Sequence, residues 1–249
     1  MDKLTLLLCG RHSSYGELSV ILSQLGMRID DFACRCYDFI SGKNENDMSV
    51  YGPYSGRTIL ETAFTIFIGR IDPYRLLLVK RYQENPNYDI SIRHKISIQW
   101  FGDVVASEKP PSWEKLSNKN IVRALLTDEY MGEIYFKKAF EDLLDDNQDE
   151  RDSEWLKELT TIQPDRVTSY VRTEADSIYS SLSKGIHQEF VIPLTTKYDK
   201  YTVKDLLQKT ISLVSKLASI THYIPTAIGN INKNELLDCL KAIEKSSGV

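Results

Sequence analysis

Apolar residues recur at spacings of three and four along most of the chain, and this period predicts helices rather than strands. The clearest run extends from Leu18 to Phe39 and places its apolar residues on one stripe of a helix of about seven turns. Ser14 and Glu17 have the spacing of a capping box at its start. Gly42 is the stop signal that we expect after its end.

The segment 57–71, RTILETAFTIFIGRI, is apolar on most sides. This pattern predicts a helix at the centre of a bundle. The preceding segment 42–56, GKNENDMSVYGPYSG, has the composition of a loop. After the central helix, Asp72 and Pro73 predict the start of another, with Asp72 as its N-cap and Pro73 in its first turn.

Helices are also predicted over most of the remaining chain, although residues 90–106 alternate like a strand and favour a helix only through their neighbours. The further helical segments are 113–144, 153–161, 164–187, 202–223 and 232–245. Strands never alternate with helices as a βαβ fold requires, and no internal repeat is present. We therefore expect an all-α multi-helix bundle of about eight to ten helices.

The most polar window, DDNQDERDSE at 145–154, is the best candidate for a domain boundary. Two organisations remain open: a single helical domain over 1–249, or two units, with residues 1–150 forming an N-terminal helical unit and residues 151–249 a C-terminal one. The apolar character of the N-terminal helices favours the single domain, because those helices need a partner surface.

Composition excludes several classes of protein. With 42% hydrophobic and 27% charged residues the chain resembles a soluble globular protein, and its net charge of −4 argues against a broad basic face that coats DNA. A local basic patch that meets RNA stays compatible with that charge. The apolar run Leu4–Cys9 is too short to span a bilayer, so we expect a cytoplasmic protein that makes no membrane contact.

The cysteines predict neither a disulfide framework nor a metal site. Cys9, Cys34, Cys36 and Cys239 are few and scattered for a chain of this length. Cys34 and Cys36 point to different faces of a helix and have no second ligand pair nearby. We expect them to be small buried hydrophobic residues in a reducing cytosol, and we expect no cofactor.

Candidate chemistry is concentrated in IYSSLSKGIHQEF, residues 178–190, because no phosphate-binding loop, dinucleotide fingerprint, zinc-protease motif or nucleophile elbow is present. Ser183, Lys184 and His187 share one helix face, since they lie three and four residues apart. Ile178, Leu182 and Ile186 form the expected core stripe on the other side, and Tyr179 lies at the edge between the two.

The polar face suits RNA backbone cleavage or binding. An imidazole at His187 can transfer protons near neutral pH, and Lys184 can stabilise charge that develops on a phosphate, with the Ser183 hydroxyl beside them. The alternative is structural: a histidine near a helix C-terminus also interacts favourably with the negative end of the helix dipole.

The pattern Y-x-x-L-S-x-x-x-H, formed by Tyr179, Leu182, Ser183 and His187, resembles the late-helix histidine segment of HEPN-like proteins. That all-α group is common among prokaryotic toxins and antiviral defence systems. The resemblance, which covers residues 164–223, implies a bundle with a long helical pair, dimerisation across the motif face and metal-independent ribonuclease activity. The family's motif also has an arginine separated from the histidine by four to six residues; the corresponding residues 180–182 are Ser, Ser and Leu, and Lys184 lies at a different spacing.

Two arginines in the central apolar region offer a replacement. Arg57 or Arg70 could approach His187 from another helix and, with Tyr179, form a binding site. The structural alternative is local ion pairing, since buried charges are costly unless paired: Arg57 with Glu61, and Arg70 or Arg75 with Asp72.

Three kinds of function follow from these observations. The first is a HEPN-like protein that acts on or binds RNA in a prokaryotic defence or toxin system, either as a degenerate ribonuclease or as a binder. The second is a non-catalytic scaffold or accessory subunit with an ATPase or nuclease partner. The third is a helical enzyme whose site is assembled from distant residues. Partners compatible with the first two are RNA, another protein or a second copy of the chain.

Overall fold

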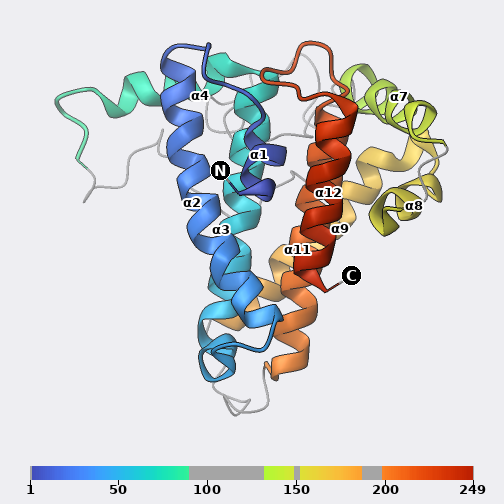
Figure 1. Cartoon of the computed structure of the whole chain (residues 1–249). Helices are drawn as coiled ribbons and strands as arrows, with labels where there is room; N and C mark the ends of the chain where they lie inside the picture. The colour runs from blue at the N-terminus through green and yellow to red at the C-terminus, as the bar shows by residue number, and fades with distance from the viewer. Residues whose placement is uncertain (1, 90–131, 149–151, 187–197, 249) are drawn as a thin grey trace.

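The computed structural model describes residues 2–89, 132–148, 152–186 and 198–248, and every regular element in these ranges is a helix (Figure 1). The expected all-α multi-helix bundle is thereby confirmed. The α-helices are α1 (Lys3–Cys9), α2 (Glu17–Ile40), α3 (Glu45–Ile71), α4 (Pro73–Gln83), α7 (Lys138–Asp146), α8 (Glu154–Thr160), α9 (Val167–Ile186), α11 (Lys200–Thr221) and α12 (Lys233–Ser247). A π-helical segment, η1 (Gly132–Lys137), leads into α7, and a 3-10 turn, η2 (Pro164–Arg166), leads into α9.

Helix α3 is the centre of the bundle, as its apolar surface predicts. It packs most extensively against α11, then α2 and α9 (Figure 1). Its second half is buried on nearly all sides, with Ile59, Leu60, Phe64 and Phe67 each fully inaccessible. A helix surrounded by others has no solvent face to cover with polar residues, which explains its composition.

The loop expected at 42–56 was wrong, because α3 already begins at Glu45 and includes Pro53. The glycines that resemble loop punctuation serve packing instead. A Cβ at Gly52 would lie 2.4 Å from Val203 Cγ1, and one at Gly56 would lie 3.0 Å from Leu207 Cδ2, so both allow α11 to approach α3 closely.

Two helix starts also differ from expectation. The capping box of Ser14 and Glu17 was wrong, because α2 follows Gly16, which has φ 55° and provides no side-chain cap. Helix α4 begins at Pro73 as predicted, but the Asp72 carboxylate accepts a hydrogen bond from Arg75 Nε at 2.9 Å rather than from a backbone amide.

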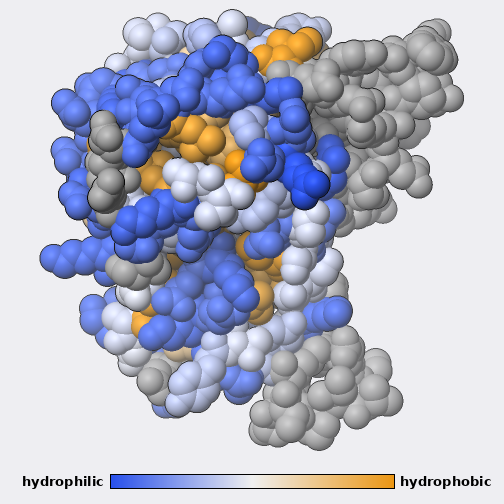
Figure 2. Space-filling model, turned by 90° about the vertical axis from the view of Figure 1, so that its right-hand side faces the viewer, coloured by the Kyte–Doolittle hydropathy of each residue, from blue (hydrophilic) through white to orange (hydrophobic). Residues whose placement is uncertain are grey.

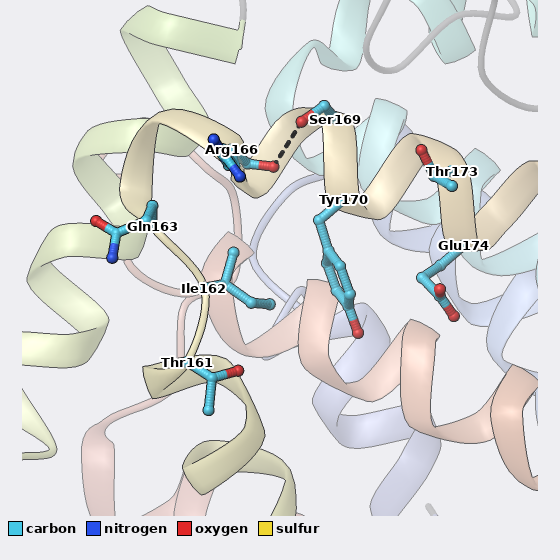
Figure 3. Close-up of a pocket in the computed structure, with 8 residues that line it drawn as sticks. All are labelled: Thr161, Ile162, Gln163, Arg166, Ser169, Tyr170, Thr173 and Glu174. Atoms are coloured by element: carbon cyan, nitrogen blue, oxygen red, sulfur yellow. Dashed lines mark hydrogen bonds between the residues drawn. The ribbon is translucent and has the colours of Figure 1, made fainter.

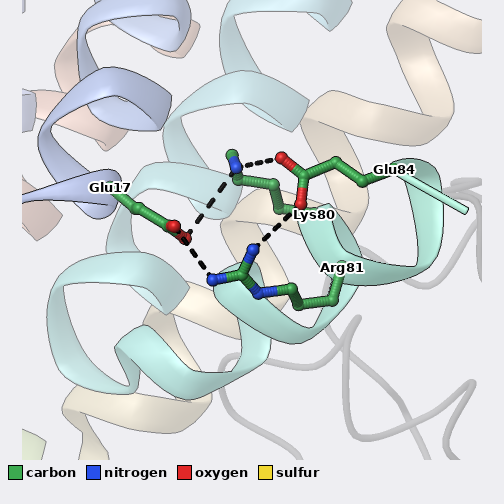
Figure 4. Close-up of polar contacts among 4 residues, drawn as sticks. All are labelled: Glu17, Lys80, Arg81 and Glu84. Atoms are coloured by element: carbon green, nitrogen blue, oxygen red, sulfur yellow. Dashed lines mark hydrogen bonds and ion pairs between the residues drawn. The ribbon is translucent and has the colours of Figure 1, made fainter.

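Glu17 instead joins the start of α2 to α4. Its carboxylate accepts a hydrogen bond from Arg81 at 2.9 Å and lies 3.8 Å from the Lys80 ammonium, while Glu84 bridges the same two cations from the end of α4 (Figure 4). Bonding to Lys80 lowers the pKa of the Glu84 carboxyl. Four charged side chains at the surface thus connect these two helices.

Arg70, at the end of α3, does not pair with Asp72 and is fully buried. Its guanidinium donates to the carbonyls of Leu8 (2.9 Å) and Ile228 (2.8 Å), to Asn230 Oδ1 (3.0 Å) and to His222 Nδ1 (3.0 Å). Burial lowers its pKa to about 10, so it remains cationic at neutral pH. One side chain therefore joins the end of α1, the end of α3 and the segment after α11.

His222 lies in the same buried cluster as a neutral imidazole. Its Nε2 is 2.7 Å from the Leu7 carbonyl and donates to it, while Nδ1 accepts from Arg70 and from the Ile231 backbone amide at 3.2 Å. A second proton, on Nδ1, would point at the N–H groups of Arg70 and Ile231, so the doubly protonated imidazole is disfavoured. Burial, and then the Arg70 charge, lower the pKa of His222 well below its ordinary value of 6.5.

The close approach of these segments requires Gly10. With φ 64° it turns the chain after α1, and a Cβ there would lie 1.9 Å from the Gly229 carbonyl oxygen. The same carbonyl accepts a hydrogen bond from the Arg11 amide at 2.9 Å. The first ten residues are therefore held against the segment that precedes α12.

The remaining predictions are confirmed in outline where they can be followed. Helices α8, α9, α11 and α12 lie within one to three residues of their expected bounds, whereas 90–106 and residues 113–131 lie outside the described ranges. Two expectations of burial were wrong: Ile186 is 39% exposed, and Cys34 is exposed while the other three cysteines are buried. Among the described residues, no helix has the length and apolar character needed to cross a membrane.

We predict that Gly52→Ala lowers the free energy of unfolding, although alanine ordinarily stabilises a helix interior relative to glycine. The added methyl overlaps the stiff Val203 side chain, so the net loss should be about 1–3 kcal/mol in urea unfolding. Val203→Ala in the same protein should recover part of that loss as a coupling energy. A higher unfolding midpoint for Gly52→Ala alone would contradict the close packing of α3 on α11.

We also predict that His222 makes stability depend on pH. Its folded pKa is depressed, so the unfolded chain binds the extra proton as pH falls below about 6.5, and stability falls by up to about 1.4 kcal/mol per pH unit there. Above that pH the full stability is present. Urea midpoints between pH 5 and 7.5 should show a smaller slope for His222→Gln than for the native protein. Identical slopes in the two proteins would rule out this role of His222.

Candidate functional site

Arg57 on α3 reaches across to the last turns of α9. Its Nη2 donates to the Tyr179 hydroxyl at 2.6 Å and its Nη1 to the Ser183 hydroxyl at 3.4 Å. Its Nε donates to Glu61 Oε1 at 2.8 Å, one turn along α3, as the i, i+4 spacing predicts. The guanidinium is therefore fixed by two helices at once.

Tyr179 supports the arginine in a second way. Its side chain is only 7% exposed, and its ring centroid lies 4.7 Å from the guanidinium carbon, within the range of a cation–π contact. The ring packs in the core while its hydroxyl accepts from Arg57. Tyr179 thus lies at the boundary between core and polar face, where the sequence pattern placed it, although it is more deeply buried than an edge position suggests.

The structure brings together some of the expected site residues. Arg57, Tyr179 and Ser183 form one hydrogen-bonded cluster, and Lys184 is exposed on the next position of α9. His187 lies outside the described residues, one helical turn in sequence beyond Ser183. The structure shows the contact of Arg57 with Ser183, and the expected approach of Arg57 to His187 stays a prediction.

Arg70 does not belong to this cluster. It follows Arg57 by thirteen residues on the same helix, which corresponds to about 20 Å along the axis. Its side chain is fully buried and bonded to the polar groups described above. Of the two arginines expected to bind, the structure places only Arg57 beside α9.

The bonding of Arg57 leaves capacity for a ligand. A guanidinium carries five N–H donors, and described residues occupy three of them. The side chain is 21% exposed, so its remaining edge meets solvent. Glu61 offsets part of its charge. The group can therefore make one directed contact with an anion, rather than attract anions from a distance.

A neighbouring group on α2 was not predicted from the sequence. Phe32 meets Tyr54 of α3 edge to face, with ring centroids 5.7 Å apart. The guanidinium carbons of Arg28 and Arg35 lie 5.8 and 6.0 Å from the Phe32 ring centroid. Arginines four before and three after an aromatic residue share its helix face, and this spacing is the signal that could have identified them.

A shallow pocket of about 340 Å³ lies elsewhere, between α8 and the start of α9 (Figure 3). Its lining is Thr161, Ile162, Gln163, Arg166, Ser169, Tyr170, Thr173 and Glu174. The Tyr170 ring extends into the bundle from this rim, and burial, followed by Glu174 and Glu158, raises the pKa of its phenol. An open rim of this kind, with no histidine or cysteine in its lining, gives no specific indication of chemistry.

The face that carries α7 and α8 gives no stronger indication. Figure 2 shows it as largely hydrophilic, with hydrophobic residues exposed only in small areas between polar ones. In the ranges that the structure describes, no group of three histidine, cysteine, aspartate or glutamate side chains is placed to hold a metal ion. The Arg57 cluster is therefore the best-defined candidate site.

Comparison with known proteins adds no relative: no family model, no curated protein and no solved structure matches the chain. Function must consequently be argued from the geometry of the site.

We predict that Tyr179→Phe lowers the free energy of unfolding by about 1 kcal/mol, because it removes the hydroxyl that accepts from Arg57 and keeps the ring. Arg57→Met should cost less in the Tyr179→Phe protein than in the native one. Urea unfolding of the two single variants and the double variant measures this coupling. Strictly additive losses would show that the bond contributes nothing to stability.

Proposed function

We propose that the chain binds RNA at the cluster of Arg57, Tyr179 and Ser183, and that it acts in a prokaryotic defence or toxin system as a HEPN-like protein. The observation that supports the proposal is the bond between Arg57 and Ser183. It places a cation from α3 beside the α9 face whose sequence resembles the HEPN histidine segment. The family's missing arginine thus has a substitute from another helix.

The chemistry of the cluster suits one RNA phosphate. A planar guanidinium presents paired donors that match two oxygens of a phosphate, and such charge-assisted bonds are stronger than neutral ones. Tyr179 and Glu61 hold the group in one orientation, which reduces the entropy lost when an anion binds. Exposed Lys184, on the same helix as Ser183, adds a second positive charge next to the cluster.

The catalytic form of this proposal assigns proton transfer to His187. The imidazole accepts the proton of a ribose 2′-hydroxyl, and that ribose oxygen bonds to the adjacent phosphorus. The bond from phosphorus to the 5′-oxygen breaks, and the leaving oxygen takes a proton from solvent water. Arg57 and Lys184 stabilise the charge on the phosphoryl oxygens. The Ser183 hydroxyl, which accepts a hydrogen bond from Arg57, orients the Arg57 guanidinium. This form needs no cofactor.

A second candidate function is a non-catalytic accessory subunit. It is favoured by the exposed apolar side chains at the start of α3, where Val50 is 66% and Tyr51 is 53% exposed, and by the acidic chain as a whole. A protein partner would cover these side chains. Purification from native cells at low salt should then recover the chain in a stoichiometric complex, whereas a lone monodisperse monomer would count against this candidate.

We predict that Arg57→Ala weakens RNA binding about tenfold, because it removes one charge-assisted phosphate contact. Binding of a labelled RNA at several salt concentrations measures the effect, and the slope against log salt should decrease by about one contact. Arg11→Ala is the matched control: it removes the same charge from an exposed pair with Glu235.

A cleavage assay with native protein and His187→Ala separates RNA binding from RNA cleavage. With a chelator present, native protein should cut RNA, and His187→Ala should bind RNA yet leave it intact. If native protein binds no RNA, the proposal is wrong. If native protein and His187→Ala both bind RNA without cutting it, only the catalytic form is wrong.

A further inference from the structure

A group of arginine and aromatic side chains on α2 and α3 adjoins the Arg57 cluster. We name Arg28, Phe32, Arg35, Tyr54 and Arg57 the arginine–aromatic strip. Phe32 joins the two helices through its edge-to-face contact with Tyr54. Tyr54 precedes Arg57 by three residues, so the two side chains are neighbours on one face of α3.

Two of the three arginines of the strip, Arg28 and Arg35, form no ion pair within the described part of the protein, whereas Arg57 pairs with Glu61. Arg28 and Arg35 are exposed and each lies over the Phe32 ring, and among the described residues neither forms a hydrogen bond or an ion pair. Asp31 lies one turn before Arg35, yet the two form no ion pair, and Glu61 bonds to Arg57 alone. The two guanidinium groups on α2 therefore remain available to an anionic partner.

The arginines on α2 are spaced for more than one anionic group. Arg28 and Arg35 lie two turns apart, about 10 Å along the axis of α2. Arg57 is held on the neighbouring helix, beyond Tyr54. A partner that meets all three cations must carry several negative charges in series, as a nucleic acid backbone does and a single small anion does not.

The aromatic members select among nucleic acids. Tyr54 is 49% exposed, contacts Phe32 of α2 and precedes Arg57 by three residues on α3. A base that is free to leave its neighbours can stack on such a ring, whereas bases in a duplex are already stacked and their faces are covered. Rows of cations that alternate with exposed aromatic rings are typical of surfaces that bind single strands.

We infer that the arginine–aromatic strip binds unpaired RNA, with one base stacked on Tyr54 and flanking phosphates bonded to Arg28, Arg35 and Arg57. This inference rests on the proposed function, whose site lies at one end of the strip. It adds the substrate class: single-stranded RNA, rather than a duplex read by its shape.

The test compares binding of an oligouridylate of about twelve nucleotides with binding of a duplex RNA of equal length. Tyr54→Ala should weaken oligouridylate binding roughly 5- to 150-fold, the loss typical of one stacked base. Tyr54→Phe keeps a ring and should bind like the native protein. Tyr74→Ala removes another exposed tyrosine, 69% accessible on α4, and should have no effect.

Charge substitutions complete the experiment. Arg28→Gln and Arg35→Gln should each lower the salt slope of oligouridylate binding by about one phosphate contact. Both substitutions are on α2, so they test the part of the strip that is separate from the Arg57 cluster on α3.

The outcomes distinguish this inference from the proposed function. Preference for the single strand, lost in Tyr54→Ala and kept in Tyr54→Phe, supports the strip. Native protein that binds RNA through Arg57 but takes duplex equally well, or is unaffected by Tyr54→Ala, overturns the strip and leaves the proposed function standing. Absence of any RNA binding by the native protein overturns both.

Discussion

The arrangement of the bundle depends on the buried guanidinium of Arg70. A charge taken from water is costly unless hydrogen bonds replace its hydration. Here two backbone carbonyls, an amide oxygen and a neutral imidazole nitrogen supply them. The Leu8 carbonyl lies in the last turn of α1, where the helix dipole is negative, so it suits a cation. Because the acceptors come from segments near both ends of the chain, those segments cannot separate without exposing an unpaired charge or unpaired acceptors. The end of α3 is thereby fixed in position.

With that end fixed, packing at the other end of α3 determines whether Arg57 can reach α9. Gly56 lies where a Cβ would be 3.1 Å from Leu182 Cδ2, and Gly185 lies where a Cβ would be 2.7 Å from Pro53. Small residues thus face bulky ones on both sides of the α3–α9 crossing, and the helices approach closely enough for a direct bond from Arg57 to Tyr179. A larger side chain at either glycine would move the helices apart and replace that bond by water. The Arg57 cluster therefore depends on the close packing of α3 on α9 at Gly56 and Gly185.

This dependence explains which features the sequence could predict. Period and length predicted the helices, the central place of α3 and the Arg57–Glu61 pair, because each is encoded within a few residues. Gly52 and Gly56 were misread as loop residues, since their purpose is apparent only when α11 is in place. Arg70 or Arg75 was expected to pair with Asp72, and Arg75 does so; the partners of Arg70 lie about 60 and 150 residues away in the chain. Similarly, the sequence offered Arg57 or Arg70 as the arginine beside α9, and only the fold chooses between them. Arg28 and Arg35 were overlooked because charged residues on the outer face of an amphipathic helix are ordinary, although their spacing from Phe32 on the same helix was visible in the sequence.

The two arginines of α3 show how environment divides one residue type between structure and recognition. Arg70 has no accessible surface and its guanidinium meets four acceptors, so it can give nothing to a ligand without unfolding its surroundings. Arg57 is held as firmly, through Tyr179, Ser183 and Glu61, yet it keeps donors and an exposed edge. A binding cation needs both properties: fixed partners that set its direction, and unfilled hydrogen-bonding capacity on the side that meets solvent. Arg28 and Arg35 have capacity but only an aromatic contact to direct them. A backbone phosphate bound at Arg57 would therefore set the register of the bound RNA. Arg28 and Arg35 on α2 would then bond to phosphates farther along the same RNA.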